Sequence, residues 1–228
     1  MPGQFVMLSC PGPSMTYLRR PFSVASFHED TIEILYRVIG KGTFNLALLK
    51  ENDYLDFVAP CGRGFDIPSK KTILLIAGGL GSAPLGYLAE YLLRYHPEKQ
   101  LYFYYGTTHM HDRVTFSRLE NQAVHFFHHS DDHGEGYPHL FSYFLDHLPS
   151  EKPDHVFCCG PTALMQSVST WSQKHNLPLQ VSLESRMACG TGACYGCSIS
   201  TQEGMKSICY DGPVFNSHIL DWNAICPL

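Results

Sequence analysis

The chain has 228 residues, a formal net charge of −5 at neutral pH, 44% hydrophobic residues and 16% charged residues. This much apolar material can form a packed core, so the composition excludes an intrinsically disordered chain. With a mildly negative net charge, the chain has no excess of basic residues for binding a nucleic acid. No apolar run approaches the roughly 18 residues that span a membrane.

Residues 1–68 alternate apolar and polar positions, which is typical of short strands with one buried face. Glycine, proline and aspartate separate four such runs, at 4–9, 21–26, 31–38 and 54–58. The apolar spacing of residues 43–50 predicts a short helix with Thr43 as its N-cap. Closely spaced strands of this kind indicate a small antiparallel β-barrel or sheet.

Residues 69–185 follow a different pattern. Residues 72–77 (TILLIA) are continuously apolar, as expected for a strand covered on both faces of its sheet. Further strands are predicted at 100–106, 124–127, 154–159 and 179–183, and helices at 83–95, 139–147 and 162–174. Strands that alternate with helices indicate parallel βαβ units, whose ligands bind beyond the carboxyl ends of the strands.

Residues 186–228 hold the densest group of cysteines in the chain. Cys189, Cys194 and Cys197 have the spacing C-x4-C-x2-C, and Cys209 follows after eleven further residues. This spacing is typical of the thiolate ligands of a plant-type 2Fe–2S cluster, and the interleaved glycines permit a tightly curled loop. Because this segment has few periodic apolar residues, we expect something other than packing to hold it together.

Other interpretations of the cysteine-rich segment stay open. A structural zinc site usually offers two C-x2-C pairs, which Cys209 does not complete, and disulfides or unligated thiols are the remaining alternatives. The N-terminus shows no secretory signal, so we expect a reducing, cytoplasmic environment. Cys10, Cys61 and Cys158 lack ligand spacing and are interpreted as small apolar residues, while Cys226 is left unassigned.

Three further segments could bind nucleotides. Arg20-Pro21-Phe22-Ser23 opens a strand, where an arginine can clamp a pyrophosphate and a serine hydroxyl can reach a flavin edge. Residues 78–84 (GGLGSAP) join a buried strand to a helix, and residues 159–161 (CGP) repeat that arrangement. Glycines let a backbone approach a phosphate, and a helix N-terminus favours an anion. Taken alone, residues 20–23 favour a plain edge strand with a surface arginine, and each of the two turns is equally compatible with a purely structural role.

Five histidines lie within residues 125–139, and because imidazole is a common metal ligand, a metal site is one interpretation of this segment. They are His125, His128, His129, His133 and His139. The neighbouring Ser, Asp and Gly residues favour a solvated loop instead.

Together and in this order, the segments resemble one family. They are residues 20–23 (RPFS), 78–81 (GGLG), 159–161 (CGP), 187–197 (MACGTGACYGC) and 209–215 (CYDGPVF). The chain resembles, over nearly its whole length, the electron transfer subunits of NAD-dependent (class B) dihydroorotate dehydrogenase, within the ferredoxin–NADP reductase superfamily.

The resemblance implies a multidomain fold of α+β and α/β type. It implies an antiparallel β-barrel that binds FAD at residues 1–68, a parallel α/β domain that binds NAD at 69–185, and a small 2Fe–2S domain at 186–228. The implied FAD contacts are Arg20, Pro21, Phe22, Ser23, Leu35, Tyr36, Arg37, Gly42 and Thr43. The implied nucleotide-binding turns contain Gly78, Gly79, Gly81, Cys159, Gly160 and Pro161, and the implied iron ligands are Cys189, Cys194, Cys197 and Cys209.

The resemblance also implies a route for electrons. A partner subunit that carries FMN oxidises dihydroorotate, and the two kinds of subunit form a heterotetramer. Electrons then pass singly through the 2Fe–2S cluster to FAD, which reduces NAD, so the chain is expected to be an oxidoreductase subunit in pyrimidine biosynthesis. Family members usually have a longer segment before the sequence that begins here at Pro2. We therefore expect one or two barrel strands to be missing and an open edge.

Three other functions fit parts of the sequence. One is a related ferredoxin–NADP reductase-type or hydrogenase-associated flavin subunit, which a different electron-donating partner would reveal. Another is a non-catalytic interaction module held together by a structural zinc ion, which metal analysis would reveal. The third is a free-standing NADH oxidase, which would turn over NADH without a partner.

Overall fold

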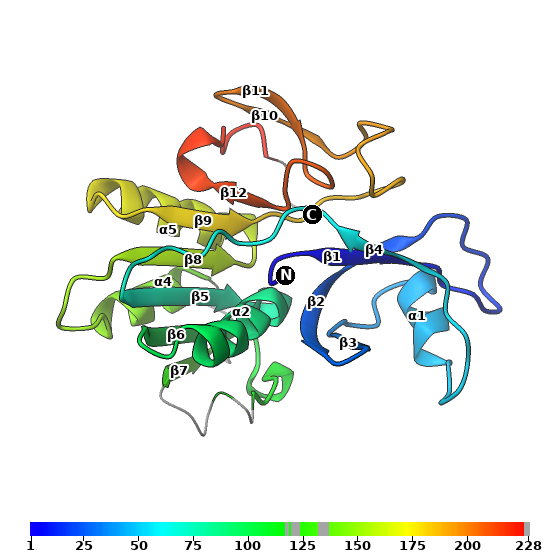
Figure 1. Cartoon of the computed structure of the whole chain (residues 1–228), viewed down its shortest axis with the longest axis horizontal. Helices are drawn as coiled ribbons and strands as arrows, with labels where there is room; N and C mark the ends of the chain where they lie inside the picture. The colour runs from blue at the N-terminus through cyan, green and yellow to red at the C-terminus, as the bar shows by residue number, and fades with distance from the viewer. Residues whose placement is uncertain (117–118, 120–123, 132–136, 226–228) are drawn as a thin grey trace.

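The computed structural model describes residues 1–116, 119, 124–131 and 137–225. An antiparallel sheet with the short helix α1 lies at the right of Figure 1, and a larger sheet flanked by helices lies at the left. The cysteine-rich segment crosses above both of them (Figure 1).

The antiparallel sheet has four strands in the order β3-β2-β1-β4. Their bounds are Phe5–Leu8 (β1), Arg20–His28 (β2), Thr31–Ile34 (β3) and Phe57–Cys61 (β4). Val6 lies opposite Phe22 across β1 and β2, and both side chains are buried in a small core of this sheet. The predicted antiparallel sheet is therefore confirmed, whereas its closure into a barrel stays a prediction.

Two predicted boundaries in this region are wrong. β3 ends at Ile34, so residues 35–37 lie in the segment that connects it to α1 (Lys41–Ala47). Thr43 is not the N-cap, because the helix begins two residues earlier and Gly40 holds that position. Instead, the Thr43 hydroxyl oxygen accepts hydrogen bonds from the N–H groups of Ile39 and Gly40, at 3.0 and 3.1 Å, which satisfies backbone donors before the first turn.

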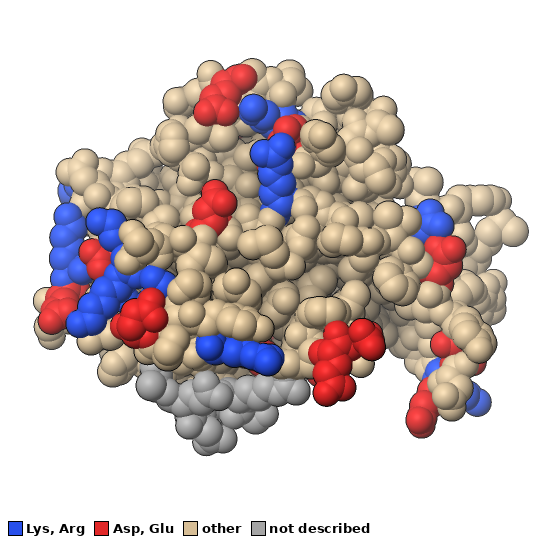
Figure 2. Space-filling view, in the orientation of Figure 1, with Lys and Arg blue, Asp and Glu red and all other residues tan. Residues whose placement is uncertain are grey.

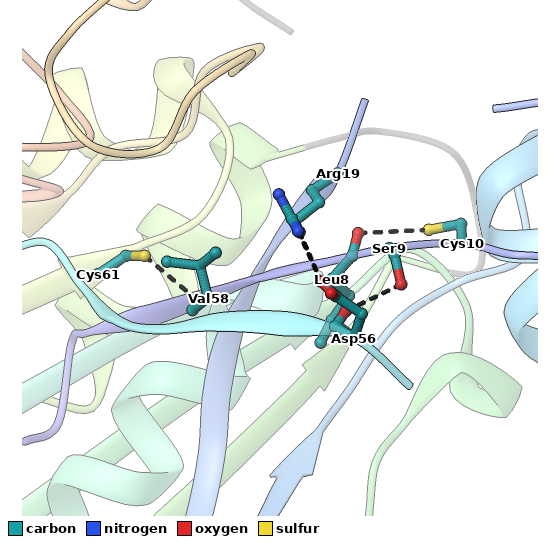
Figure 3. A network of polar contacts seen from close by, with 7 residues as sticks. All are labelled: Leu8, Ser9, Cys10, Arg19, Asp56, Val58 and Cys61. Atoms are coloured by element: carbon teal, nitrogen blue, oxygen red, sulfur yellow. Dashed lines mark hydrogen bonds and ion pairs between the residues drawn. The ribbon is translucent and has the colours of Figure 1, made fainter. Parts of the chain in front are cut away.

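Polar contacts fasten β1 to β4 (Figure 3). The Arg19 guanidinium donates from Nε and Nη2 to Asp56 Oδ1, at 2.9 and 2.7 Å, and the Ser9 hydroxyl donates to the Asp56 carbonyl at 2.9 Å. The buried thiols of Cys10 and Cys61 each donate to a nearby backbone carbonyl. Their burial agrees with the interpretation of both as small apolar residues.

The larger sheet has six strands in the order β12-β9-β8-β5-β6-β7. The parallel strands are β5 (Thr72–Gly78), β6 (Gln100–Thr107), β7 (Val124–Ser130), β8 (His155–Cys159) and β9 (Leu179–Ser182). The helices that connect them are α2 (Ser82–Tyr95), α4 (Tyr137–Asp146) and α5 (Thr162–Lys174). Every residue of β5 is buried, as its unbroken apolar sequence predicted.

The cysteine-rich segment contributes strands that the sequence did not predict. β10 (Ser198–Thr201) and β11 (Gly204–Ser207) form a hairpin, and β12 (Val214–Asn216) pairs antiparallel with β9 at the edge of the six-stranded sheet. The expectation that this segment builds no core is wrong, because Ile199, Ile208 and Phe215 are buried in the same core as the parallel strands.

The division into three domains at residues 68 and 185 stays a prediction. Within the described part of the chain, no helix has both the length and the apolar character needed to cross a membrane. Figure 2 shows acidic and basic side chains interspersed over the visible face, without a continuous basic stripe on that face.

Candidate functional site

A cavity of about 280 Å³ lies at the carboxyl edge of the parallel strands. Its lining includes both predicted nucleotide-binding turns, represented by Gly78, Gly79, Gly81, Gly160 and Pro161. Thr107, the last residue of β6, and Thr108, which follows it, complete this side of the cavity. The structure therefore brings together two turns that lie about eighty residues apart in the sequence, as the βαβ pattern predicted.

The two turns fit against each other without side chains between them. A Cβ atom on Gly81 would collide with the backbone of Cys159 and Gly160, and one on Gly160 would lie 2.9 Å from the Gly78 nitrogen. Glycine is needed at these positions because the backbones approach so closely. Cys159 itself is buried, and its thiol donates to the Ser182 carbonyl at 3.5 Å rather than lining the cavity.

Helix α2 begins beside the glycine turn, so its free backbone N–H groups lie next to the cavity. The Ser82 hydroxyl at its first position is fully buried and has no hydrogen-bond partner within the described residues. A buried hydroxyl without a partner is rare in a folded protein and is often found where a ligand or water binds. These features fit the phosphate groups of a bound dinucleotide.

Three charged side chains line the cavity among the described residues, and of these the sequence analysis singled out only Arg37. Arg37 enters from the antiparallel sheet region, and its Nη2 atom lies 3.1 Å from Asp112 Oδ1. Asp112 belongs to the short 3-10 helix η2 (Met110–Asp112), which carries no recognisable motif. Glu184 is exposed to the cavity but surrounded by protein, and this desolvation raises the pKa of its carboxyl.

The proposed flavin-binding residues gather at the N-terminal side of α1. A Cβ atom on Gly42 would lie 3.4 Å from Arg20 Cγ and 3.4 Å from Cys10 Sγ, so glycine lets the arginine lie against the helix. Arg20 Nη1 donates to the Leu18 carbonyl at 2.8 Å, and its Nε and Nη2 atoms have no partner among the described residues. The Tyr36 ring packs edge-on against Phe22, with centroids 5.7 Å apart.

Not every predicted flavin contact lies in that group. Pro21 and Ser23 are half-buried on β2, opposite Met7 and Phe5. Leu35 is half-buried in the connecting segment. The Thr43 hydroxyl is already engaged at the start of α1, so it has less capacity for a ligand than the sequence implied. Arg20, with its unengaged N–H groups, and Gly42, which lets Arg20 lie against the helix, are better suited than Thr43 to contact an anionic nucleotide.

The cysteine loop directs backbone N–H groups at its sulfur atoms. The N–H of Thr191 donates to Cys189 Sγ at 3.4 Å, and the N–H of Gly192 donates to Cys209 Sγ at 3.1 Å. The N–H of Cys209 also donates to Cys197 Sγ at 3.4 Å. Such bonds stabilise thiolate sulfur and adjust the electronic properties of a metal centre that it holds.

The loop is curled by residues in the left-handed backbone region. Gly190 and Gly192 have φ angles of 73° and 82°, and a Cβ atom on either would press against Met7 or Tyr210. Tyr195 has a φ of 56° although it is not a glycine. The glycine positions singled out in the sequence are therefore explained by both conformation and close packing.

The four thiols lie as two pairs. Cys189 is within hydrogen-bonding reach of Cys194, and Cys209 of Cys197. Cys209 also interacts electrostatically with Cys189, so the two pairs lie close to each other. Four thiolates with the spacing C-x4-C-x2-C and a later fourth cysteine suit a cluster of two bridged irons.

In the metal-free protein, the pKa values of two of these thiols lie far apart. The Thr191 N–H lowers the pKa of Cys189 to about 6, whereas burial raises the pKa of Cys209 to about 12. Cys194 is the exposed member of the set, and Cys197 is buried. Binding of a metal centre must therefore remove the proton from a buried thiol.

His125 lies on β7, as the strand predicted at 124–127 implied, and β7 pairs with β6 over its whole length. The prediction of a solvated loop is wrong for His128 and His129, because β7 continues to Ser130. His128 Nε2 lies 3.0 Å from Thr107 Oγ1, and the ring of His129 stacks on an aromatic ring of α4 with centroids 4.8 Å apart. His133 and the side chain of His139 lie outside the described residues, as does Cys226.

Comparison with curated proteins decides the family. A relative from Caldanaerobacter subterraneus subsp. tengcongensis is 38% identical over 219 residues, which cover 94% of this chain and 84% of the relative. Its name is dihydroorotate dehydrogenase B (NAD⁺), electron transfer subunit. The chain belongs to this family. Further electron transfer subunits, from Clostridium acetobutylicum and Listeria monocytogenes, are 34% and 37% identical and cover 94% and 95% of the chain, or 83% and 85% of those relatives.

Two other comparisons agree with membership among the electron transfer subunits. Residues 184–221 match the family model of the iron–sulfur cluster binding domain of dihydroorotate dehydrogenase B. A solved NADH-dependent reduced ferredoxin–NADP oxidoreductase superposes with a TM-score of 0.84 at 26% identity, covering 97% of this chain and 80% of that one. The ferredoxin–NADP⁺ reductase of Plasmodium falciparum shares the fold, with a TM-score of 0.56 at 15% identity and 77% coverage of each chain.

Proposed function

We propose that this chain is the electron transfer subunit that links a dihydroorotate-oxidising subunit carrying FMN to NAD⁺. It holds a 2Fe–2S cluster and FAD and reduces NAD⁺, as an oxidoreductase active within a complex. The observation that carries this proposal is the paired arrangement of four cysteines in the segment that matches the family model. Homology over 94% of the chain supports the same function.

The cysteine loop would hold the cluster through Cys189 and Cys194 on one side and Cys197 and Cys209 on the other. When bound, a 2Fe–2S cluster supplies transfer of single electrons. The backbone N–H groups of Thr191 and Gly192 stabilise negative charge on the sulfur atoms. Because Cys194 is exposed, this side of the loop offers the shortest route to a redox partner.

The two nucleotides would occupy neighbouring regions. Arg20 and Gly42, with the other residues of the strand and helix start, are proposed to bind FAD. The turns at 78–81 and 159–161 are proposed to bind the NAD phosphates, because they combine close backbone approach with the N-terminus of α2. Arg37 lines the cavity between the two regions, so the flavin and nicotinamide sites adjoin.

The finer features of the family remain part of the proposal. They include closure of the antiparallel sheet into a barrel, the division into three domains, assembly into a heterotetramer and a cytoplasmic location. The family relationship favours the electron-transfer function over a related flavin subunit, a zinc-stapled module or a free-standing NADH oxidase.

The decisive experiment combines the anaerobically purified chain with an FMN-containing dihydroorotate-oxidising subunit. NADH should form from dihydroorotate and NAD⁺ only when both proteins are present. Replacement Cys209→Ser should abolish NADH formation, because it removes one cluster ligand, while Cys61→Ser, at a buried thiol outside the loop, should retain it. Equal NADH formation without this chain, or with the Cys209→Ser variant, would refute the proposed function.

A further inference from the structure

An ion pair joins the two halves of the protein at the nucleotide cavity. Arg37 follows the antiparallel sheet, and Asp112 follows β6 of the parallel sheet. Their Nη2 and Oδ1 atoms are 3.1 Å apart, and both residues line the cavity. Arg37 is 54% exposed and Asp112 is 22% exposed, so the carboxylate is the better anchored partner.

Each member of the pair is supported by a tyrosine of its own region. The hydroxyl of Tyr105, which is 1% exposed, donates to the Asp112 carbonyl at 3.4 Å and accepts from the Val114 N–H at 3.3 Å. These bonds fasten η2 to β6. Arg37 directly follows Tyr36, whose ring packs against Phe22 in the core of the antiparallel sheet. These contacts hold the backbone of both residues, and the Asp112 carboxylate accepts the Arg37 guanidinium from this supported position.

The pair leaves most of the guanidinium available. An arginine has five N–H donors in a planar fork, and the contact with Asp112 engages Nη2. The other lining residues with ionisable side chains include a second carboxylate, Glu184, and Arg37 is the cation among the described lining residues. A phosphate that enters this cavity has one positively charged side chain to bind.

We propose that Asp112 is a positioning residue, which holds the Arg37 guanidinium at the cavity so that its remaining N–H groups receive a phosphate of a bound dinucleotide. The proposal rests on the proposed function, because it requires FAD and NAD as ligands. Preorganisation of the arginine reduces the entropy lost on binding, and the planar fork suits phosphate oxygens. The phosphate belongs to FAD or to NAD, and the test distinguishes these two sources.

The proposal makes a prediction opposite in sign to that of simple charge repulsion. A carboxylate beside an anion-binding cavity should weaken anion binding, so its neutralisation should strengthen the binding of a dinucleotide. A positioning role requires the reverse. Asp112→Asn should therefore weaken dinucleotide binding although it removes a negative charge.

The test measures two affinities with protein that retains its cluster. FAD affinity is followed by flavin fluorescence on release, and NADH affinity by calorimetry. We expect Asp112→Asn to weaken one or both by about threefold to tenfold, and Arg37→Ala by about tenfold or more. The double variant should bind no more weakly than Arg37→Ala, because Asp112 acts through the arginine. The matched control is Glu98→Gln, which removes the exposed carboxylate of the Glu98–Lys99 contact just before the amino end of β6, whereas the cavity lies at the carboxyl ends of the strands; it should leave both affinities unchanged.

Each outcome has a defined meaning. Weaker FAD binding identifies the flavin phosphate as the ligand of Arg37, and weaker NADH binding identifies the phosphate of the nicotinamide nucleotide. Unchanged or tighter binding by Asp112→Asn, or a further loss in the double variant, overturns the proposal. If Asp112→Asn does not fold, the variant Arg37→Lys is measured in its place, because lysine keeps the positive charge without the planar guanidinium. Unchanged FAD and NADH affinities of Arg37→Lys would then overturn the proposal. Failure of the wild-type chain to bind FAD and NADH would instead refute the proposed function.

Discussion

At the scale of single residues, His155 is a buried titratable group. It begins β8, is 7% exposed, and its Nε2 atom lies 3.2 Å from Gln180 Nε2. Desolvation lowers the pKa of its imidazole to about 4. The folded protein therefore disfavours the protonated form.

This burial predicts a loss of stability in mild acid. Because the folded pKa lies below the unfolded value of about 6.5, the stabilising effect is complete above that value and is lost as the pH falls towards 4. Between pH 7 and pH 5, His155 should account for a loss of about 2 kcal/mol in the free energy of unfolding. Urea denaturation at both pH values should show this loss reduced in His155→Gln. The exposed His218→Gln should behave like wild type, and equal pH dependence in all three proteins would contradict the assignment.

Sequence reasoning singled out candidate site residues where a local motif marks them. Gly81 was predictable because the close approach of the Cys159 and Gly160 backbone requires glycine, and Gly79 because its φ angle of 55° favours glycine. The four cysteines were singled out by their spacing, and their role as iron ligands stays a prediction. Asp112 was not predictable, because its partner Arg37 comes from another sheet. The structural role of Thr43 was misjudged because the helix begins two residues earlier than predicted, which changes what the Thr43 hydroxyl contacts.

At the scale of elements, the cysteine-rich segment is fastened to the parallel domain by more than one strand pairing. β12 pairs with β9, and the Ser169 hydroxyl on α5 donates to Ser217 Oγ at 3.2 Å. The Trp222 indole N–H donates to the same Ser169 oxygen at 3.1 Å. One buried serine therefore connects α5 to two places near the end of the chain.

Replacement of that serine should loosen the attachment. Ser169→Ala should lower the free energy of unfolding by about 1–3 kcal/mol, because it leaves the polar atoms of Ser217 and Trp222 without this partner. Ser167→Ala, on the exposed side of the same helix, should change it by less than about 0.5 kcal/mol. Chemical denaturation compares the two variants. Equal stabilities would show that the shared serine is not part of the attachment.

Elements with a long, regular pattern were predicted from the sequence, whereas the short strands of the cysteine-rich segment were not. β5 and α2 each have enough apolar residues to show their periodicity. Strands β10, β11 and β12 have only three or four residues, so alternation within them carries little information. His128 and His129, which extend β7 beyond the predicted strand at 124–127, were misread because polar residues favour loops, while pairing with β6 overrides that preference.

At the scale of the whole molecule, one core spans all three predicted regions. Phe5 and Met7 of β1 share it with Leu74 of β5 and with Cys197 and Cys209, the proposed cluster ligands. The cysteine loop also packs directly on β1, because a side chain at position 190 would press against Met7. Such contacts between distant segments could be inferred only from the family resemblance. They place the metal-binding loop against the proposed flavin region.

The central claim is that this loop binds two irons rather than one zinc ion. The most direct measurement is the iron, sulfide and zinc content of protein purified without oxygen, for wild type, Cys197→Ser and Cys61→Ala. We expect about two irons and two sulfides per chain in wild type and Cys61→Ala, with loss of both in Cys197→Ser. About one zinc per chain, with neither iron nor sulfide, would contradict the account.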